Sequence, residues 1–219
     1  MSITRDIASH ENAVAYGGLI DAIGDWVLTT ACRQMRAWDA AGLPAVPVAV
    51  NISPRQFRQR RLQEKVMAVL ADTGVAADRL VLEITESAVM DDVDTAIAIL
   101  HELKKQGVRT EIDDFGTGHS SLSYLKRLPI QRLKIDRSFV RDIPHDSDDI
   151  AIVTAILSMA ANLSIDIIAE GVETATQETF LLSEGCIAMQ GFRFARPLPA
   201  DDFALLLRRG TARPEDSPA

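Results

Sequence analysis

The sequence predicts an α/β protein in which a parallel sheet is surrounded by helices. Short runs of β-branched and other apolar residues alternate with longer amphipathic segments through most of the 219 residues. This alternation is typical of consecutive β–α units, because each helix connects two parallel strands. Polar residues also recur at the ends of the short apolar runs, which predicts functional side chains along one edge of the sheet. The length suits one domain with a sizeable core.

The composition is that of an ordinary globular protein, and it limits the classes of partner. Hydrophobic residues make up 47% of the chain and charged residues 25%, and the net charge is −8. This negative charge argues against a nucleic-acid polymer or an anionic membrane surface as the partner. It leaves a phosphate substrate open, because metal ions bound by carboxylates reverse the local charge. We expect a cytoplasmic protein without membrane insertion, since no apolar run approaches the roughly 18 residues of a membrane span.

The first half of the chain is expected to hold two strands and three helices after an atypical polar segment at residues 1–17. Apolar residues at spacings of three and four, from Leu19 to Trp38, predict the first helix, and Gly42 ends it. The runs PVAVN and RLVLEIT predict buried strands, with Glu83 as an unusual acid inside the second. The predicted elements are a helix over 18–41, a strand over 46–51, a helix over 62–70, a strand over 79–85 and a helix over 96–105.

The second half continues the same alternation. Acidic residues begin the longest predicted helix here, where they suit the positive end of the helix dipole. A disordered tail is expected over 210–219, because it combines prolines with mixed charge. The predicted elements are a strand from 108 to the acids at 113 and 114, a short helix over 122–128, a strand over 132–135, a helix over 148–163, a strand over 166–169, a helix over 174–183, a strand over 187–194 and a helix over 201–209.

The stretch VRTEIDDFGTGHSS at 108–121 departs from a generic α/β pattern. Asp113 and Asp114 are adjacent carboxylates at the end of a strand, and they repel each other unless a positive charge lies between them. A divalent cation with oxygen ligands meets this need, and a shared carboxylate can bridge two ions. Gly116 and Gly118 allow the following backbone to approach a ligand closely. For the acid pair alone, a solvated turn at the strand end remains the alternative.

Polar residues at or near the ends of successive strands strengthen the functional interpretation. Each residue alone has a structural explanation, such as a turn at Asn51, an ion pair at Glu83 or a snorkelling Lys134. Their recurrence, strand after strand, is how a (β/α) barrel builds an active site. No glycine-rich dinucleotide or P-loop motif follows the first strand. The set comprises Asn51, Glu83, Asp113, Asp114, Lys134, Glu170 and Gln190.

Several longer motifs carry a resemblance to a known family. They are VNISPRQF at 50–57, LEITES at 82–87, DDFGTGHSSLSYLKRLP at 113–129, LKIDRSFV at 133–140, AEGVE at 169–173 and QGFRFARPLP at 190–199. On these motifs the chain resembles the EAL domain family, hydrolases that open cyclic di-GMP to linear pGpG with Mg²⁺ or Mn²⁺. The resemblance implies a TIM-like (β/α) barrel of the EAL type over 18–209 and a two-metal site.

The resemblance also implies roles for individual residues. Asn51, Glu83 and Asp113 correspond to ligands of the first metal. Asp113 bridges to the second metal, which Asp114 and Glu170 hold further. Glu170 therefore counts among the catalytic residues.

The resemblance assigns further roles around the metals. Lys134 corresponds to the residue that orients or polarises the attacking water. Gln190 corresponds to a contact with water or substrate, and Asp136 is expected to contact the substrate. The residues implied to support the loop after the acid pair are Glu86, Glu173, Gly116 and Gly118.

The chain also departs from the family pattern. It has no Glu-Ala-Leu triplet and no nearby substrate-binding Arg, and the leading strands that carry them are missing. His119 stands where relatives commonly carry Tyr. We therefore expect an incomplete barrel of about six parallel strands, whose open edges favour a homodimer or a strand-completing partner.

These departures leave two functions in competition. The first is a metal-dependent cyclic di-GMP phosphodiesterase whose activity is weak or absent, because one metal ligand is missing. The second is a catalytically inactive EAL protein that acts as a cyclic di-GMP sensor or a protein-binding adaptor. A sugar-phosphate barrel enzyme is disfavoured, since RPLP follows the last strand where a phosphate-binding helix would begin.

Overall fold

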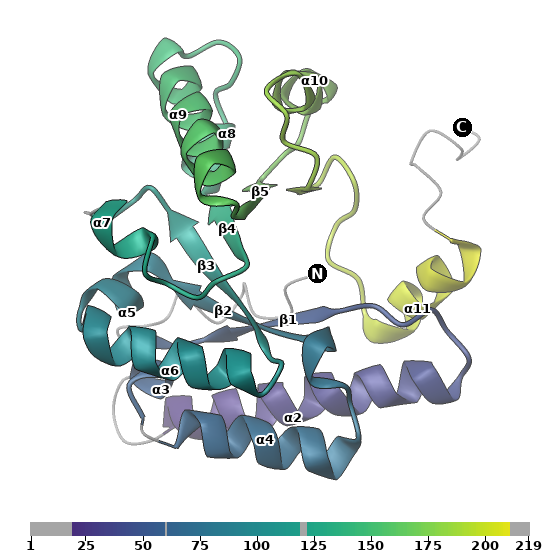
Figure 1. Ribbon diagram of the computed structural model, residues 1–219. Coiled ribbons are helices and arrows are strands. Elements are labelled where there is room, and N and C mark those ends of the chain that lie inside the picture. Colours follow the sequence, from purple (N-terminus) through teal and green to yellow (C-terminus); the bar gives the residue numbers. More distant parts are fainter. Residues whose placement is uncertain (1–18, 60, 119–121, 211–219) are drawn as a thin grey trace. The chain divides into compact units, whose positions relative to one another are not determined.

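The structure is a computed structural model that describes residues 19–59, 61–118 and 122–210 (Figure 1). The segment expected at 1–17, His119 and nearly all of the tail expected at 210–219 lie outside the described residues. Within the described residues, no helix combines the length and the apolar character needed to cross a lipid bilayer.

The strands form a six-stranded sheet in the order β1-β2-β3-β4-β5-β6, which follows the chain. β1 pairs parallel with β2, and β3 to β6 pair parallel in succession. The predicted α/β class with parallel strands is therefore confirmed. The strands are β1 (Val48–Ile52), β2 (Leu80–Thr85), β3 (Arg109–Phe115), β4 (Arg132–Ile135), β5 (Asp166–Glu170) and β6 (Met189–Gln190).

Helices follow the strands along the chain (Figure 1). They are α2 (Leu19–Ala40), α3 (Pro54–Phe57), α4 (Leu62–Thr73), α5 (Glu86–Met90), α6 (Val93–Lys105), α7 (Leu122–Leu125), α8 (Arg137–Val140), α9 (Ser147–Leu163), α10 (Ala175–Ser183) and α11 (Ala200–Arg209), with a short 3₁₀ helix at Ala77–Arg79. The chain divides into two compact units. The first comprises Met1–Ile84, Asp94–Thr110 and Pro197–Ala219, and the second comprises Thr85–Val93 and Glu111–Arg196.

The first unit is built on β1, β2 and the helix α2. Every second residue of β1 is buried, as expected for a strand with one face on a core. On α2 the buried residues recur at helical spacing, and α2 lies beside α4 (Figure 1). The buried residues of α2 are Val27, Leu28, Ala31, Cys32, Met35 and Trp38.

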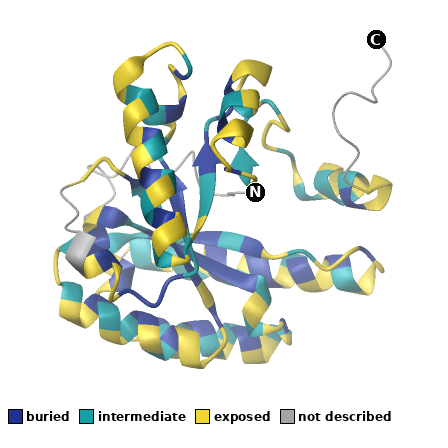
Figure 2. Cartoon of the chain, turned by 45° about the horizontal axis from the view of Figure 1, so that its top comes forward, coloured by how far each residue is buried: buried dark blue, intermediate teal, exposed yellow. Residues whose placement is uncertain are grey.

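The second unit is built on β3 to β6 with α5, α8, α9 and α10. Leu133, Ile135 and Ala169 are fully buried in the strands, and Val153 and Ala160 are fully buried on α9. Figure 2 shows α9 with buried residues on one side and exposed residues on the other. Asp146 caps the start of this helix, because its side chain accepts hydrogen bonds from the backbone amides of residues 148 and 149.

The boundaries predicted for the last strand are wrong, and one short helix was not predicted. The strand predicted over 187–194 is limited to Met189–Gln190, because the chain turns at Gly191. A Cβ at Gly191 would lie 2.1 Å from the carbonyl oxygen of Val172, so only glycine permits this close approach. Between the strand predicted over 46–51 and the helix predicted over 62–70, the chain forms the short helix α3, which Ser53 and Gln56 cap reciprocally.

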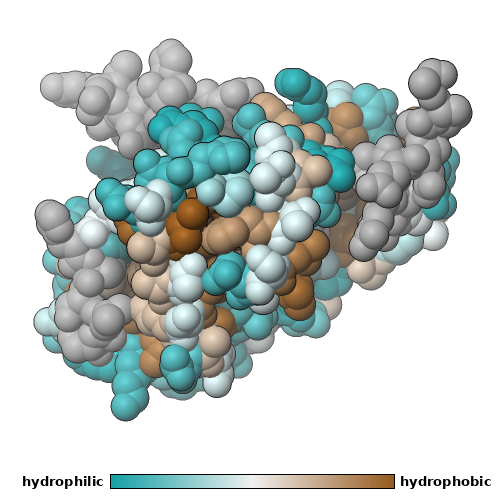
Figure 3. Space-filling model, turned by 90° about the horizontal axis from the view of Figure 1, so that it is seen from above, coloured by the Kyte–Doolittle hydropathy of each residue, from teal (hydrophilic) through white to brown (hydrophobic). Residues whose placement is uncertain are grey.

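The surface carries exposed apolar residues as well as charged ones. Figure 3 shows hydrophobic residues, in brown, gathered among hydrophilic residues on the face seen from above. The most exposed large apolar side chains include Trp26 in the first unit and Ile187 and Phe192 in the second. Single exposed apolar residues are normal on protein surfaces and do not by themselves indicate a binding site.

Candidate metal centre

The candidate centre begins with a bulge in β3. Glu111 and Ile112 pair in register with Arg132 and Leu133 of β4, but the next pair is Phe115 with Ile135. Two residues, Asp113 and Asp114, therefore lie opposite the single residue Lys134. An extra residue in one strand interrupts the regular alternation of side chains between the faces of a sheet.

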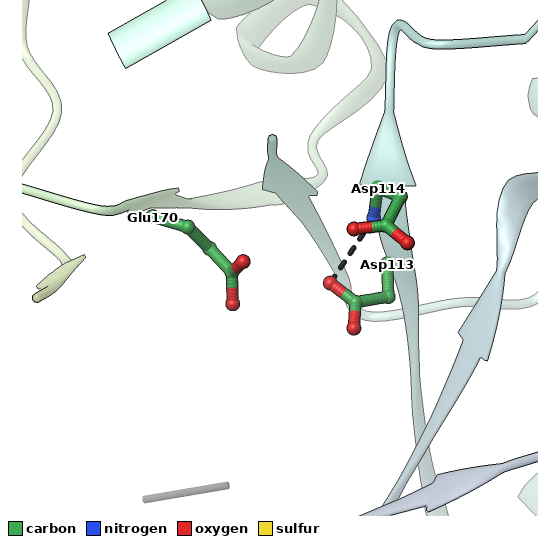
Figure 4. Close-up of side chains that lie close together, drawn as sticks. All are labelled: Asp113, Asp114 and Glu170. Carbon is green, nitrogen blue, oxygen red and sulfur yellow. Dashed lines mark hydrogen bonds between the residues drawn. The ribbon is translucent and has the colours of Figure 1, made fainter. Parts of the chain in front are cut away.

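The conformation of Asp114 completes this bulge. Its φ of 54° is in the left-handed region, which residues other than glycine rarely adopt. Its backbone amide donates a 3.0 Å hydrogen bond to Oδ1 of Asp113 (Figure 4). Strained backbone of this kind persists where surrounding structure enforces it, and it is common at functional sites.

An ion pair fixes the register just before the bulge. Glu111 is 5% exposed, and Nη1 of Arg132 donates to its Oε1 at 2.9 Å. Burial raises the pKa of Glu111, whereas the positive charge of Arg132 opposes this rise. Because Glu111 and Arg132 are also partners across the two strands, their bond holds the start of the bulge in place.

Three carboxylates meet in the second unit. Asp113 and Asp114 from β3 and Glu170 from the end of β5 each offer an oxygen, and these oxygens lie within 4.8 Å of one another. Figure 4 shows Glu170 extending toward the two aspartates from the neighbouring part of the sheet. Glu170 is 3% exposed, and the side chain of Asp113 is 13% exposed.

Lys134 is the cation at the centre of this cluster. Its Nζ lies 2.7 Å from Oε1 of Glu170 and 3.1 Å from Oδ1 of Asp113, and its side chain is only 2% exposed. The ammonium group balances one negative charge of the three carboxylates. Two negative charges remain when all three are ionised, so the cluster still favours an additional cation.

The electrostatics of Asp114 reflect this excess of negative charge. Burial raises its pKa to about 6, and the negative charges of Asp113, Asp136 and Glu170 add to this rise. A hydrogen bond between the side chains of Asp114 and Asp136 adds to the rise of the Asp114 pKa and acts to lower the pKa of Asp136. Burial acts to raise the pKa of Asp136, but hydrogen bonds from Ser138, Asp114 and Arg137 together outweigh it and lower that pKa below its usual value.

The donor set of the cluster fits a hard divalent cation. Its ligands are carboxylate oxygens, which Mg²⁺ and Mn²⁺ prefer, and it contains no thiolate or imidazole that would favour Zn²⁺. The like charges and the raised pKa of Asp114 are the signs expected of ligands arranged for a cation.

The remaining predicted metal ligands belong to the first unit. Asn51 on β1 and Glu83 on β2 are register partners, so their Cα atoms face each other across this strand pair. Glu83 is 3% exposed. The sequence therefore places both residues correctly near the carboxyl ends of adjacent strands.

The predicted loop-support residues are partly brought together. Oε2 of Glu86, a residue with 1% exposure, accepts a 2.8 Å hydrogen bond from the amide of Gly116. Gly116 has a φ of 100°, which favours glycine, whereas a Cβ at Gly118 would lie 2.6 Å from Oε1 of Glu86, so that the Glu86 side chain would have to shift. Glu173 differs, because it is exposed and its backbone amide donates to Oε1 of Gln177.

Gln190 and Asp136 lie at strand ends beside the cluster. Gln190 pairs in register with Glu170, and its carbonyl accepts a hydrogen bond from the amide of Val172. Asp136 follows β4 and caps α8 by accepting a 2.8 Å hydrogen bond from the amide of Ser138. Both residues are therefore held by their own backbone surroundings next to the carboxylates.

One residue near the cluster was not predicted from the sequence. Gln177 is 5% exposed and forms hydrogen bonds to two separate backbone segments. The spacing of Thr174 and Gln177 is that of a helix capping box, which is the sequence signal that could have identified it.

The chain is thus a parallel α/β protein with a cluster of carboxylates, able to hold a cation, at the carboxyl ends of its strands. The chain belongs to the EAL domain family, because the family model matches residues 12–197.

Curated relatives agree with this assignment. The chain is 50% identical over 184 residues to the bifunctional diguanylate cyclase/cyclic di-GMP phosphodiesterase MucR of Pseudomonas aeruginosa, covering 84% of this chain and 27% of MucR. It is 46% identical over 182 residues to the cyclic di-GMP phosphodiesterase NbdA of the same species, covering 83% of this chain and 23% of NbdA. The chain thus spans about a quarter of the length of these two relatives.

Solved structures share the fold. A cyclic di-GMP complex of the MucR phosphodiesterase matches with a TM-score of 0.82 and 49% identity, covering 85% of this chain and 75% of that chain. A manganese and cyclic di-GMP complex of BlrP1 from Klebsiella pneumoniae matches with a TM-score of 0.74 and 30% identity, covering 84% and 46%. These matches confirm the predicted family and the TIM-like fold of six parallel strands with surrounding helices.

Proposed function

We propose that this chain is an EAL-type phosphodiesterase that hydrolyses cyclic di-GMP to pGpG with two Mg²⁺ or Mn²⁺ ions. The observation that carries the proposal is the cluster of Asp113, Asp114 and Glu170 around the buried Lys134. The relatives MucR and NbdA, which are described as cyclic di-GMP phosphodiesterases, support it.

The charges in the site explain why metal ions are needed. A phosphodiester is an anion, and the cluster carries excess negative charge, so the two repel each other until cations are bound. When bound, divalent metal ions supply a water of lowered pKa and stabilise the negative charge that develops on the phosphate. In this proposal Asp113, Asp114 and Glu170 hold the metals, together with Asn51 and Glu83.

The remaining side chains position the reactants. Lys134 holds Asp113 and Glu170 through its ammonium group and is the residue we assign to orienting the attacking water. Gln190 and Asp136, at the ends of β6 and β4, are assigned to water or substrate contacts. In each case rigid strand ends hold the group, which reduces the entropy lost on reaching the reactive geometry.

The activity proposed for this chain is weak, because no Glu-Ala-Leu triplet is present to supply a further metal ligand. Loss of residues that only support metal ligands lowers metal affinity 10–100-fold, and loss of a ligand has at least this effect. The same observation favours the second candidate, a catalytically inactive EAL protein that acts as a cyclic di-GMP sensor or a protein-binding adaptor.

We further propose a cytoplasmic protein whose barrel domain, over 18–209, forms a homodimer or binds a partner that adds strands to its sheet. The support is that β1 and β6 are the edges of the sheet formed by the described residues, and edge strands present backbone groups for pairing with another chain. Sedimentation of the purified protein distinguishes a monomer from a dimer.

A hydrolysis assay separates the two functions. Cyclic di-GMP is incubated with the protein and Mn²⁺ or Mg²⁺, and pGpG is separated by chromatography. The enzyme proposal predicts slow pGpG formation that Asp113→Asn abolishes and Asp72→Asn preserves, since Asp72 is 70% exposed on α4, in the other unit. Cyclic di-GMP binding without any product would support the sensor instead.

A further inference from the structure

A single buried amide side chain connects the segment after β5 with the segment after β4. Oε1 of Gln177 accepts hydrogen bonds from the backbone amides of Glu173 at 2.8 Å and Thr174 at 2.9 Å. Its Nε2 donates to the backbone carbonyls of Val140 at 3.1 Å and Arg141 at 2.9 Å. The side chain is 5% exposed, so these bonds are shielded from water and rigidify the groups they join.

Both connected segments begin at the carboxylate cluster. Glu170 ends β5, and Glu173 follows three residues later. On the other side, Lys134 lies on β4, and α8 follows at once and ends at Val140. Gln177 therefore ties the chain that leaves Glu170 to the chain that leaves Lys134.

A close backbone approach limits movement in the opposite direction. Gly171 directly follows Glu170 and has a φ of 72°. A Cβ at Gly171 would lie 2.5 Å from the Cβ of Arg137, so the segment after β5 already touches the start of α8. This contact prevents the two segments from moving closer, and the hydrogen bonds of Gln177 prevent them from separating.

We propose that Gln177 is a positioning residue that holds Glu170 against Lys134 and thereby sets the affinity of the carboxylate cluster for divalent cations. The inference rests on the proposed function, since it concerns the same metal centre. Glutamine suits this position because one uncharged side chain offers an acceptor to two amides and a donor to two carbonyls. Loss of a residue that supports metal ligands lowers metal affinity by about 10–100-fold.

The test separates this role from simple capping of α10. Gln177→Glu keeps an acceptor for the amides of Glu173 and Thr174, and glutamate also serves in a capping box. It removes the donor to the carbonyls of Val140 and Arg141 and places a carboxylate against them. Only the hydrogen bonds to the end of α8 are therefore lost. A second variant, Gln177→Met, removes both the acceptor Oε1 and the donor Nε2 of this side chain.

Thr174→Ala is the matched control. It removes the hydroxyl that caps the same helix at Gln177 N and leaves the Gln177 side chain in place. For each full-length variant, Mn²⁺ binding is measured by electron paramagnetic resonance, and thermal unfolding is measured without metal. Where the protein hydrolyses cyclic di-GMP, kcat and KM are measured separately.

The inference predicts that Gln177→Glu and Gln177→Met weaken Mn²⁺ binding by about 10-fold or more, while Thr174→Ala stays within about twofold. It also predicts that kcat at a fixed, subsaturating Mn²⁺ concentration falls more than KM changes. The inference is overturned if the Gln177 variants lose thermal stability as Thr174→Ala does but bind Mn²⁺ like the wild type. A wild-type chain that binds no Mn²⁺ overturns both this inference and the proposed function, whereas equal binding by all variants overturns this inference alone.

Discussion

The raised pKa of Asp114 predicts that the metal-free protein loses stability as the pH rises. The pKa increases from the ordinary 3.8 to about 6 in the folded protein, so the folded state binds the proton more tightly than the unfolded state. The contribution of Asp114 to the free energy of unfolding is therefore largest below about pH 4, and it is lost as the pH rises through about 6. The full shift corresponds to about 3 kcal/mol, and solvent screening of this partly exposed carboxyl reduces the expected loss to about 1–2 kcal/mol.

Asp114→Asn removes the titrating group and tests this sign directly. Asparagine tolerates the left-handed conformation of residue 114 and carries no charge at any pH. Urea unfolding is measured in EDTA at pH 5 and pH 7 for the wild type, Asp114→Asn and the control Asp72→Asn. We expect Asp114→Asn to gain about 0.5–1 kcal/mol relative to the wild type between pH 5 and pH 7, because about half of the total loss falls in this interval, whereas Asp72→Asn gains nothing.

Two results would refute this reasoning about Asp114. One is a wild type and an Asp114→Asn variant whose stabilities change equally between the two pH values. The other is a variant that loses stability relative to the wild type on going from pH 5 to pH 7. Saturating Mn²⁺ should reverse the wild-type trend, because a metal ion binds the ionised carboxylate and competes with the proton.

Three further variants test other parts of the site. Lys134→Met removes the buried cation between Asp113 and Glu170 and should lower the free energy of unfolding by about 3–5 kcal/mol in EDTA at pH 7. Mn²⁺ should restore part of this stability, and equal losses with and without metal would contradict the prediction. Gly116→Ala should lower the free energy of unfolding in urea by more than about 1 kcal/mol, because its Cβ would lie 2.9 Å from the Phe139 ring. This loss should exceed that of the control Gly74→Ala, where φ is also positive but no atom lies within 4 Å of the added Cβ. Glu86→Ala removes the acceptor of the Gly116 amide and should cost about 1–3 kcal/mol in the same assay; a change below about 0.5 kcal/mol would show that the contact does not stabilise the loop.

The sequence predicts the strands and the proximity of the three carboxylates because local signals agree with the fold. Apolar β-branched runs identify β2 and β4 closely, and helical spacing identifies α2 within two residues at each end. Asp113, Asp114 and Glu170 end strands of one parallel sheet, so their proximity follows from the rule that carboxyl ends of parallel strands share an edge.

The features that the sequence does not reveal depend on contacts between distant segments. The bulge at Asp113 and Asp114 depends on the register with β4, and no local pattern encodes the left-handed Asp114. The hydrogen bond from Gln177 to the carbonyl of Val140 likewise depends on the packing of α8 and α10, which are distant in the sequence. The early end of β6 depends on the contact between Gly191 and Val172, which periodicity does not report.

A Mn²⁺ titration tests whether the carboxylate cluster on β3 and β5 binds divalent metal ions. Binding is followed by electron paramagnetic resonance at pH 7.5 for the wild type, Asp113→Asn and Asp72→Asn. We expect saturable binding by the wild type and Asp72→Asn that is lost or at least 100-fold weaker in Asp113→Asn. Equal Mn²⁺ affinity in the wild type and Asp113→Asn would contradict this expectation, because the metal would then bind elsewhere.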